Sequence, residues 1–223
     1  FKASIIGCGS VGATTAYSFL LGGIVTDLAL IDLDSSKANG LKLDLEHATS
    51  FCHKINILAG DDYSLIKNSD VVIVCAGARQ QEGETRLDLI KKNKSIFNVI
   101  IPNITKNAPD SILIIVTNPV DILTRHSIDL SGFDPSKVFG TGTVLDSIRL
   151  QFHISEKIAV SPKSIDAYVL GEHGDSSFPL FSSANVLGKS LVDFDGFTKQ
   201  VADECYEMTK NAAYRIINDQ GYT

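Results

Sequence analysis

The 223-residue sequence lacks the features that mark several large classes of protein. It contains no tryptophan, so tryptophan fluorescence cannot report ligand binding. Basic residues are not in excess: 20 Lys and Arg stand against 26 Asp and Glu, a net charge of −6 that argues against nucleic acid or an anionic membrane as partner. The longest apolar runs, VVIVCA from Val71 and ILIIV from Ile112, are a quarter to a third of the roughly 20 residues that a membrane helix needs. We therefore expect neither a membrane span nor a polyanionic partner.

The cysteines form no recognisable motif. None of the four, which are Cys8, Cys52, Cys75 and Cys205, belongs to a CxxC pair or clusters with histidine, which argues against zinc and redox motifs. The first residues include no basic segment and no Ala-x-Ala cleavage site, so we expect no secretion signal. These features predict reduced thiols and a cytoplasmic protein. The way the chain begins and ends also predicts that it is part of a longer one.

The first 140 residues alternate short apolar runs with helical stretches, a pattern typical of a parallel sheet covered by helices on both faces. The expected strands are 3–6, 28–31, 71–76, 112–117 and 138–139, and the expected helices are 12–21, 35–50, 85–107 and 119–129. From about residue 141 the character changes, and helices are expected at 145–156 and 197–218. The last helix is expected to bury one face, made of Phe197, Val201, Met208, Ala212 and Ile216.

The string GCGSVG lies between the first expected strand and the first expected helix. Gly7 permits a tight turn, Gly9 lets the backbone approach a pyrophosphate, and Gly12 allows the helix to pack closely on the strand. Asp32 ends the next strand, twenty residues beyond Gly12, where a carboxylate can accept hydrogen bonds from a ribose. A glycine-rich turn and a helix N-cap are the structural alternatives. The two features together favour a dinucleotide, and the carboxylate favours NAD over NADP because it would repel a 2′-phosphate.

A second signal is the polar string GEHGDSSFP, which places His173 in a loop. Upstream, Asp146 and Arg149 are three residues apart, so on a helix both side chains would point to one face. A carboxylate that orients an imidazole, beside a guanidinium that binds a planar anion, is what a 2-oxo acid reductase requires. A structural histidine and an ordinary intrahelical ion pair remain the alternatives.

Two further polar segments follow expected strands, at the sheet edge where ligands bind in this class of fold. The segment GARQQEGETRLDL includes Arg79, Gln81 and Arg86, and TNPVD includes Asn118. The alternatives are a solvated connector for the first and a turn-forming Asn-Pro for the second.

These strings resemble one family along essentially the whole chain: the L-lactate and L-malate dehydrogenases, and within them the NAD-dependent L-lactate branch. The resemblance rests on GCGSVG, ALID, AGARQQEGETRLDL, TNPVD, GTGTVLDSIR, GEHGDS and GYT. It implies an α/β fold, with a Rossmann-type doubly wound parallel sheet that binds NAD over 1–140. A mixed α/β substrate domain follows over 141–223, with its C-terminal part missing. It further implies an oxidoreductase that interconverts (S)-lactate and pyruvate in glycolysis and fermentation, as a cytoplasmic homotetramer.

The resemblance also assigns roles to individual residues. As catalytic groups it implies His173, which exchanges a proton with the substrate oxygen, Asp146 as its partner, and Arg86, which polarises the carbonyl. For the small 2-oxo or 2-hydroxy acid it implies Arg149, Gln81, Asn118 and Thr223. For NAD it implies Gly7, Gly9, Gly12, Asp32, Arg79 and Asn118, and it implies no metal. A malate dehydrogenase or a non-catalytic NAD sensor are the alternative functions.

Few positions depart from the family pattern. Phe181 and Ser183 replace the Trp and His of many relatives. Gln151 and Asp166 stand where the family's bisphosphate-activated members have an Arg and a His. Because a bisphosphate needs paired positive charge, we expect pyruvate saturation to be insensitive to fructose 1,6-bisphosphate. The alternative is that neighbouring basic residues such as Lys157 or Lys163 supply the charge from different positions.

Gln81 generates the first testable prediction. Malate enzymes of the family carry Arg at this position, which pairs with the second carboxylate of oxaloacetate. A neutral glutamine would leave that charge unpaired in a dry site, at a cost of about 2 to 5 kcal/mol. We expect a preference for pyruvate, and Gln81→Arg to shift it toward oxaloacetate, measured as kcat/KM on both acids. Equal or better efficiency of the unmutated enzyme on oxaloacetate would contradict this assignment.

Overall fold

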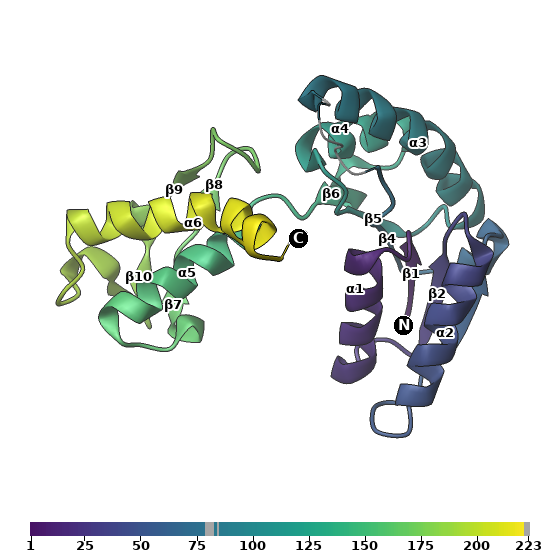
Figure 1. The fold of residues 1–223 in the computed structure, drawn as a ribbon, viewed down its shortest axis with the longest axis horizontal. Helices are drawn as coiled ribbons and strands as arrows, with labels where there is room; N and C mark the ends of the chain where they lie inside the picture. Colours follow the sequence, from purple (N-terminus) through teal and green to yellow (C-terminus); the bar gives the residue numbers. More distant parts are fainter. Residues whose placement is uncertain (79–82, 84, 221–223) are drawn as a thin grey trace. The chain divides into compact units, whose positions relative to one another are not determined.

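The computed structural model describes residues 1–78, 83 and 85–220, with Arg86 described by its backbone alone. The chain divides into two compact units, Phe1–Gly140 and Thr141–Thr223 (Figure 1).

The first unit is built on six parallel strands in the order β3-β2-β1-β4-β5-β6. Their bounds are β1 Lys2–Ile6, β2 Asp27–Ile31, β3 Asn56–Gly60, β4 Val71–Val74, β5 Ile112–Ile115 and β6 Val138–Gly140. The strand order reverses between β1 and β4, which is the topological switch point of a doubly wound sheet. The predicted Rossmann-type fold is therefore confirmed.

Helices cover both faces of this sheet, and each face has its own core. The helices α1 (Ser10–Gly22) and α2 (Ser35–Ala48) pack on one face, and α3 (Arg86–Asn107) and α4 (Val120–Ser131) pack on the other (Figure 1). Because both faces are buried, the strands are apolar at nearly every position, which is why they could be located in the sequence. Two short 3-10 helices, Tyr63–Ile66 and Pro135–Lys137, lie in the connections.

Strand β3 was not among the expected strands. Its sequence, NILAG, contains only two large apolar residues and begins with an exposed asparagine. It lies at the edge of the sheet and pairs only with β2, so it has less surface to bury than the central strands. The expected strands 71–76 and 112–117 both end two residues earlier, at Val74 and Ile115. Their last residues belong to loops at the carboxyl edge.

The second unit is the mixed α/β domain that the resemblance implied. Its two long helices, α5 (Val144–Ile158) and α6 (Lys199–Gln220), pack against each other (Figure 1). The strands β7 (Ile165–Asp166), β10 (Asn185–Val186) and β11 (Lys189–Ser190) form a small antiparallel sheet, and β8 (Val169–Leu170) pairs with β9 (Phe178–Pro179). Three 3-10 helices complete it: Pro162–Ser164, Phe181–Ser183 and Leu191–Asp193.

The prediction for the buried face of α6 was partly wrong. Met208 and Ile216 are 43% and 37% exposed, whereas the helix buries Ala202, Cys205 and Thr209. These three small side chains recur at helical spacing, and small residues let a helix approach its neighbour closely. Phe197 is buried and Val201 packs against the core as expected, so the error is confined to the large side chains of Met208 and Ile216.

The turn from β1 into α1 depends on contacts that only glycine permits. Gly7 has a φ of +99°, and a Cβ on it would lie 2.5 Å from the backbone nitrogen of Ala76. A Cβ on Gly12 would lie 2.0 Å from the Gly7 carbonyl oxygen, so helix and strand are packed as the sequence predicts. A Cβ on Gly9 would meet nothing within 4 Å. Two of the glycines are therefore required by packing, and the third leaves open space.

The difference in space around Gly12 and Gly9 can be tested with a matched pair of substitutions. We expect Gly12→Ala to lower the free energy of unfolding by about 1–3 kcal/mol, because its methyl group overlaps backbone that cannot move away. Gly9→Ala should change it by less than about 0.5 kcal/mol, because its φ of −74° suits alanine and the space is empty. Urea unfolding of both variants measures the contrast. Equal destabilisation by the two substitutions would contradict the packing role of Gly12.

Candidate active site

Asp32 follows β2 directly and holds the glycine-rich turn. Its Oδ2 accepts a hydrogen bond of 2.7 Å from the backbone N–H of Cys8, and its Oδ1 accepts one of 3.1 Å from that of Asp34. The Lys37 Nζ lies 3.6 Å from Oδ2. The N-cap of α2 is Asp34, not Asp32, so the N-cap alternative for Asp32 is wrong. Asp32 is thus fixed beside the turn that precedes α1.

The residues around this turn fit a dinucleotide. The open space at Gly9 is where ligand atoms could approach the backbone, since a Cβ there would fill it. Gly9 is also the N-cap of α1 and contributes no side-chain hydrogen bond, and a helix N-terminus favours an anion. Burial, with a smaller contribution from Asp32, raises the pKa of the Cys8 thiol to about 11. Cys8 is therefore neutral near pH 7 and adds no negative charge beside a phosphate.

Asn118 lies in the loop after β5 and is held by Asn93, a residue that the sequence analysis missed. The Asn93 side chain is fully buried; its Nδ2 donates to the Asn118 carbonyl (2.8 Å), and its Oδ1 accepts from the Ala78 backbone N–H (2.7 Å). The peptide bond from Asn118 to Pro119 is cis. Asn93 therefore ties the loop after β5 to the start of the polar segment after β4. A polar residue one turn before the apolar Phe97, on the buried face of α3, was the available signal.

Arg86 is the first residue of α3, and the start of this helix is well defined. Thr85 is the N-cap and accepts from the Asp88 backbone N–H (3.2 Å), while the Asp88 carboxylate accepts from the Thr85 N–H (3.2 Å). This capping box fixes the backbone at Arg86. The Arg86 side chain lies outside the described residues, as do Arg79, Gln81 and Thr223.

The second unit brings His173, Asp146 and Arg149 together. The His173 Nδ1 lies 2.6 Å from the Asp146 Oδ2, and the Arg149 Nη1 lies 3.6 Å from the Asp146 Oδ1. The side chains of Asp146 and Arg149 are only 15% and 16% exposed, and that of His173 is 26% exposed. The intrahelical ion pair considered as an alternative does exist. The same carboxylate also binds the imidazole, one oxygen for each partner.

This arrangement can carry out acid–base chemistry on an anionic molecule. Because Nδ1 of His173 is held by Asp146, the other ring nitrogen, Nε2, points away from the carboxylate. The carboxylate stabilises the imidazolium and keeps the ring in one orientation. Arg149 has five N–H donors in a planar fork, which matches a carboxylate. A group that can donate a proton and a group that can bind an anion are thus both held by the Asp146 carboxylate.

Gln151 and Asp166, the two positions considered for a bisphosphate, both lie in the second unit. The Gln151 Nε2 donates to the Ala167 carbonyl oxygen (3.1 Å), and Asp166 is exposed on β7.

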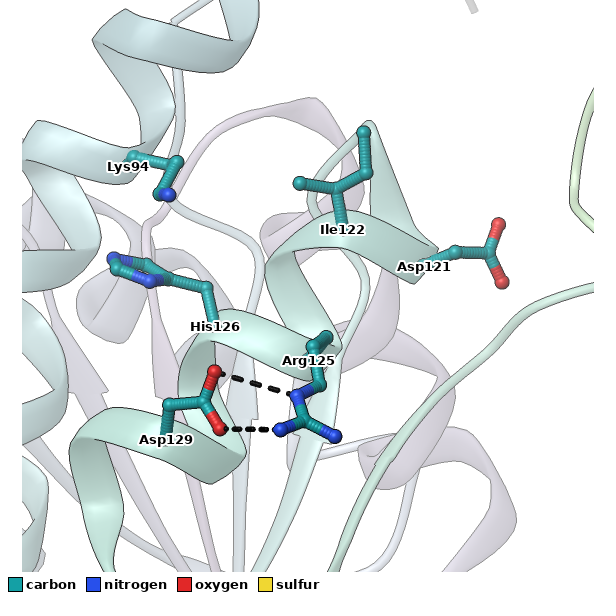
Figure 2. A pocket seen from close by; sticks show the side chains of 6 residues that line it. All are labelled: Lys94, Asp121, Ile122, Arg125, His126 and Asp129. Atoms are coloured by element: carbon teal, nitrogen blue, oxygen red, sulfur yellow. Dashed lines mark hydrogen bonds and ion pairs between the residues drawn. The ribbon is translucent and has the colours of Figure 1, made fainter.

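A separate pocket of about 390 Å³ lies on α3 and α4 (Figure 2). Its lining is Lys94, Asp121, Ile122, Arg125, His126 and Asp129. Arg125 is already paired with Asp129, with 3.0 Å between Nη2 and Oδ1, and His126 Nε2 lies 2.8 Å from Asn98 Oδ1. The pocket contains none of the residues predicted for catalysis, so we assign it no part in the reaction.

Two further features are absent from the described part of the chain. No helix there combines the length and apolar character needed to cross a membrane. No group of three or more His, Cys, Asp or Glu side chains there is arranged to hold a metal ion.

Comparisons with known proteins agree with these observations. The family model for the lactate/malate dehydrogenase NAD binding domain matches residues 1–140, and that for the lactate/malate dehydrogenase alpha/beta C-terminal domain matches residues 143–223. The whole chain is 44% identical, over 231 residues, to the L-lactate dehydrogenase of Clostridium botulinum (strain Loch Maree / Type A3) and covers 71% of it. It is 42% identical to the probable L-lactate dehydrogenase of Schizosaccharomyces pombe, of which it covers 68%.

Solved structures give the same result. A lactate dehydrogenase from a Medee basin deep-sea metagenome library superposes on the whole chain with a TM-score of 0.95 at 36% identity. The minor L-lactate dehydrogenase of Enterococcus mundtii does so with a TM-score of 0.94 at 37% identity, and this chain covers 72% of each. The chain therefore belongs to the lactate/malate dehydrogenase family of oxidoreductases, and its first 140 residues are that family's NAD-binding domain.

Proposed function

We propose that the chain interconverts (S)-lactate and pyruvate with NAD as cofactor. The observation that carries the proposal is the arrangement of His173 and Arg149 on one partly buried carboxylate, that of Asp146. It supplies a proton donor and a binding group for a carboxylate, and these are the two groups that a 2-oxo acid requires. The relatives named above as L-lactate dehydrogenases support lactate over malate as substrate.

In the direction of pyruvate reduction, His173 acts as a general acid. It enters the reaction as the imidazolium, and its Nε2 gives a proton to the ketone oxygen, which becomes the hydroxyl of lactate. Asp146 stabilises the charged imidazole before the transfer and holds its orientation afterwards. The dinucleotide held at the glycine-rich turn of the first unit would supply the hydride as NADH in this direction and would accept it as NAD⁺ in the other. In lactate oxidation the neutral imidazole removes the hydroxyl proton.

Arg149 binds the substrate carboxylate. Its guanidinium is mostly buried, and a buried ionic hydrogen bond is stronger than an exposed one. Asp146 sets the position of this guanidinium as well as that of the imidazole. Arg149 would thus bind the substrate and His173 would protonate it, and Asp146 holds both side chains.

The remaining roles follow from the family resemblance. We assign Arg86 to polarising the substrate carbonyl, Gln81 to selecting pyruvate, and Asn118 and Thr223 to contacts with the substrate. We assign Gly7, Gly9, Gly12, Asp32, Arg79 and Asn118 to NAD. On this proposal residues 1–140 bind the cofactor and residues 141–223 carry the proton donor.

We further propose a cytoplasmic homotetramer that acts in glycolysis and fermentation. The four cysteines are all free thiols, which suits a reducing compartment. Four apolar side chains on α5, each at least 49% exposed, support self-association: Val144, Leu145, Ile148 and Phe152. Sedimentation equilibrium of the full-length protein should give four times the mass of one chain. A monomer mass across micromolar concentrations would contradict the proposal.

The pH dependence of the two directions tests the role of His173. Reduction uses the imidazolium, so its rate should fall as pH rises through the pKa of His173. Oxidation uses the neutral ring, so its rate should fall as pH falls through the same pKa. His173→Gln should lower both rates at least about 100-fold, because it removes the proton-transferring group. The change in NADH absorbance measures both directions.

The control is the dissociation constant for NADH, which His173→Gln should leave within about twofold. A variant that retained turnover would remove His173 from the mechanism. Full-length enzyme that is active on other 2-oxo acids but not on pyruvate would overturn the proposed substrate.

A further inference from the structure

The loop that carries His173 is attached to the domain at both of its ends. It joins β8 to β9 and is closed by a hydrogen bond of 3.2 Å from the Ser177 N–H to the Gly174 carbonyl. At the first end, the Val169 N–H donates to the hydroxyl of Ser147 (2.9 Å), a buried residue of α5 next to Asp146. Helix α5 therefore holds both the imidazole and the strand that leads into the loop.

At the second end, the loop is held by Tyr206 of α6. The phenolic O–H of Tyr206 donates to the Ser177 carbonyl oxygen. The Ser177 hydroxyl lies 3.1 Å from the same phenolic oxygen. Since the phenolic proton is used on the carbonyl, the Ser177 hydroxyl is the donor in this second contact. One tyrosine oxygen thus binds both the backbone and the side chain of the residue that closes the turn after His173.

The Tyr206 ring is itself held in place. It is half-buried and packs against the core of the second unit, and the Lys210 Nζ lies 5.6 Å from the ring centroid. A ring fixed on two sides gives its hydroxyl a defined position. The hydroxyl of Tyr206 therefore holds the end of the loop on α6, whereas α5 holds its start.

We propose that Tyr206 is a positioning residue for His173, acting through Ser177. Helix α5 holds the ring of His173 and the start of the loop, and α6 holds the end of the loop. Together they keep the imidazole in the orientation needed for proton transfer. Without the α6 attachment, the loop would remain folded but would sample orientations in which Nε2 does not reach the substrate. This inference rests on the proposed role of His173 as the proton donor.

Tyr206→Phe tests it in the full-length protein, because it removes only the hydroxyl and keeps the packing of the ring. We expect kcat for pyruvate reduction to fall about 3- to 10-fold, the range that corresponds to one net hydrogen bond. The KM for pyruvate and the dissociation constant for NADH should each stay within about twofold. Amide hydrogen exchange should become faster in the peptide that spans 171–177 and stay unchanged in the first unit.

Two further variants sharpen the test. Ser177→Ala removes the side-chain contact but leaves the carbonyl that Tyr206 binds, so its effect on kcat should be smaller. Tyr168→Phe is the matched control, since Tyr168 lies in the same unit with its side chain about half exposed, and kcat should not change.

Unchanged hydrogen exchange in Tyr206→Phe would overturn the attachment. Faster exchange with unchanged kcat would overturn the positioning role. A loss confined to KM would assign the contact to substrate binding and would also overturn the proposal. Absence of activity on pyruvate in the unmutated protein would instead reject the proposed function, while hydrogen exchange would still decide whether Tyr206 holds the loop.

Discussion

The chemistry of the second unit depends on one carboxylate. Asp146 offers one oxygen to His173 and the other to Arg149, and its side chain is only 15% exposed. Removing either partner would leave a poorly compensated charge, so the three side chains stabilise one another. The loop after β8 and the helix α5 are consequently constrained to meet at this point, and the hydroxyls of Ser147 and Tyr206 hold the loop on either side of it.

In the first unit, too, single polar side chains hold loops in place, although the residues are different. Asp32 binds the backbone of the glycine-rich turn, and Asn93 joins the loops that follow β4 and β5. In each case a polar side chain satisfies backbone groups of a loop at the carboxyl edge of the sheet. Backbone groups of buried loops need partners, so these side chains contribute to stability and give the loops a single conformation.

Much of this protein was predictable because the relevant forces are local. Strands buried on both faces are continuously apolar, and the turn at Gly7 excludes any residue with a Cβ, so both left a clear pattern. The short edge strand β3 and the buried face of α6 were missed or misplaced. Their burial depends on what packs against them, and small residues such as Ala202 and Cys205 carry little signal of their own.

The sequence by itself determined the alternation of strands and helices, the glycine-rich turn, and the strings that relate the chain to its family. The family resemblance already implied that Asp146 is the partner of His173. Only the tertiary structure decided that its two oxygens are divided between His173 and Arg149, that Asn93 joins two loops of the first unit, and that Ser147 and Tyr206 hold the His173 loop of the second. The physical reason is distance along the chain: Asp146 and His173 are 27 residues apart, and Tyr206 is 29 from Ser177. No local periodicity encodes such a pairing, because the folding of the intervening chain sets it.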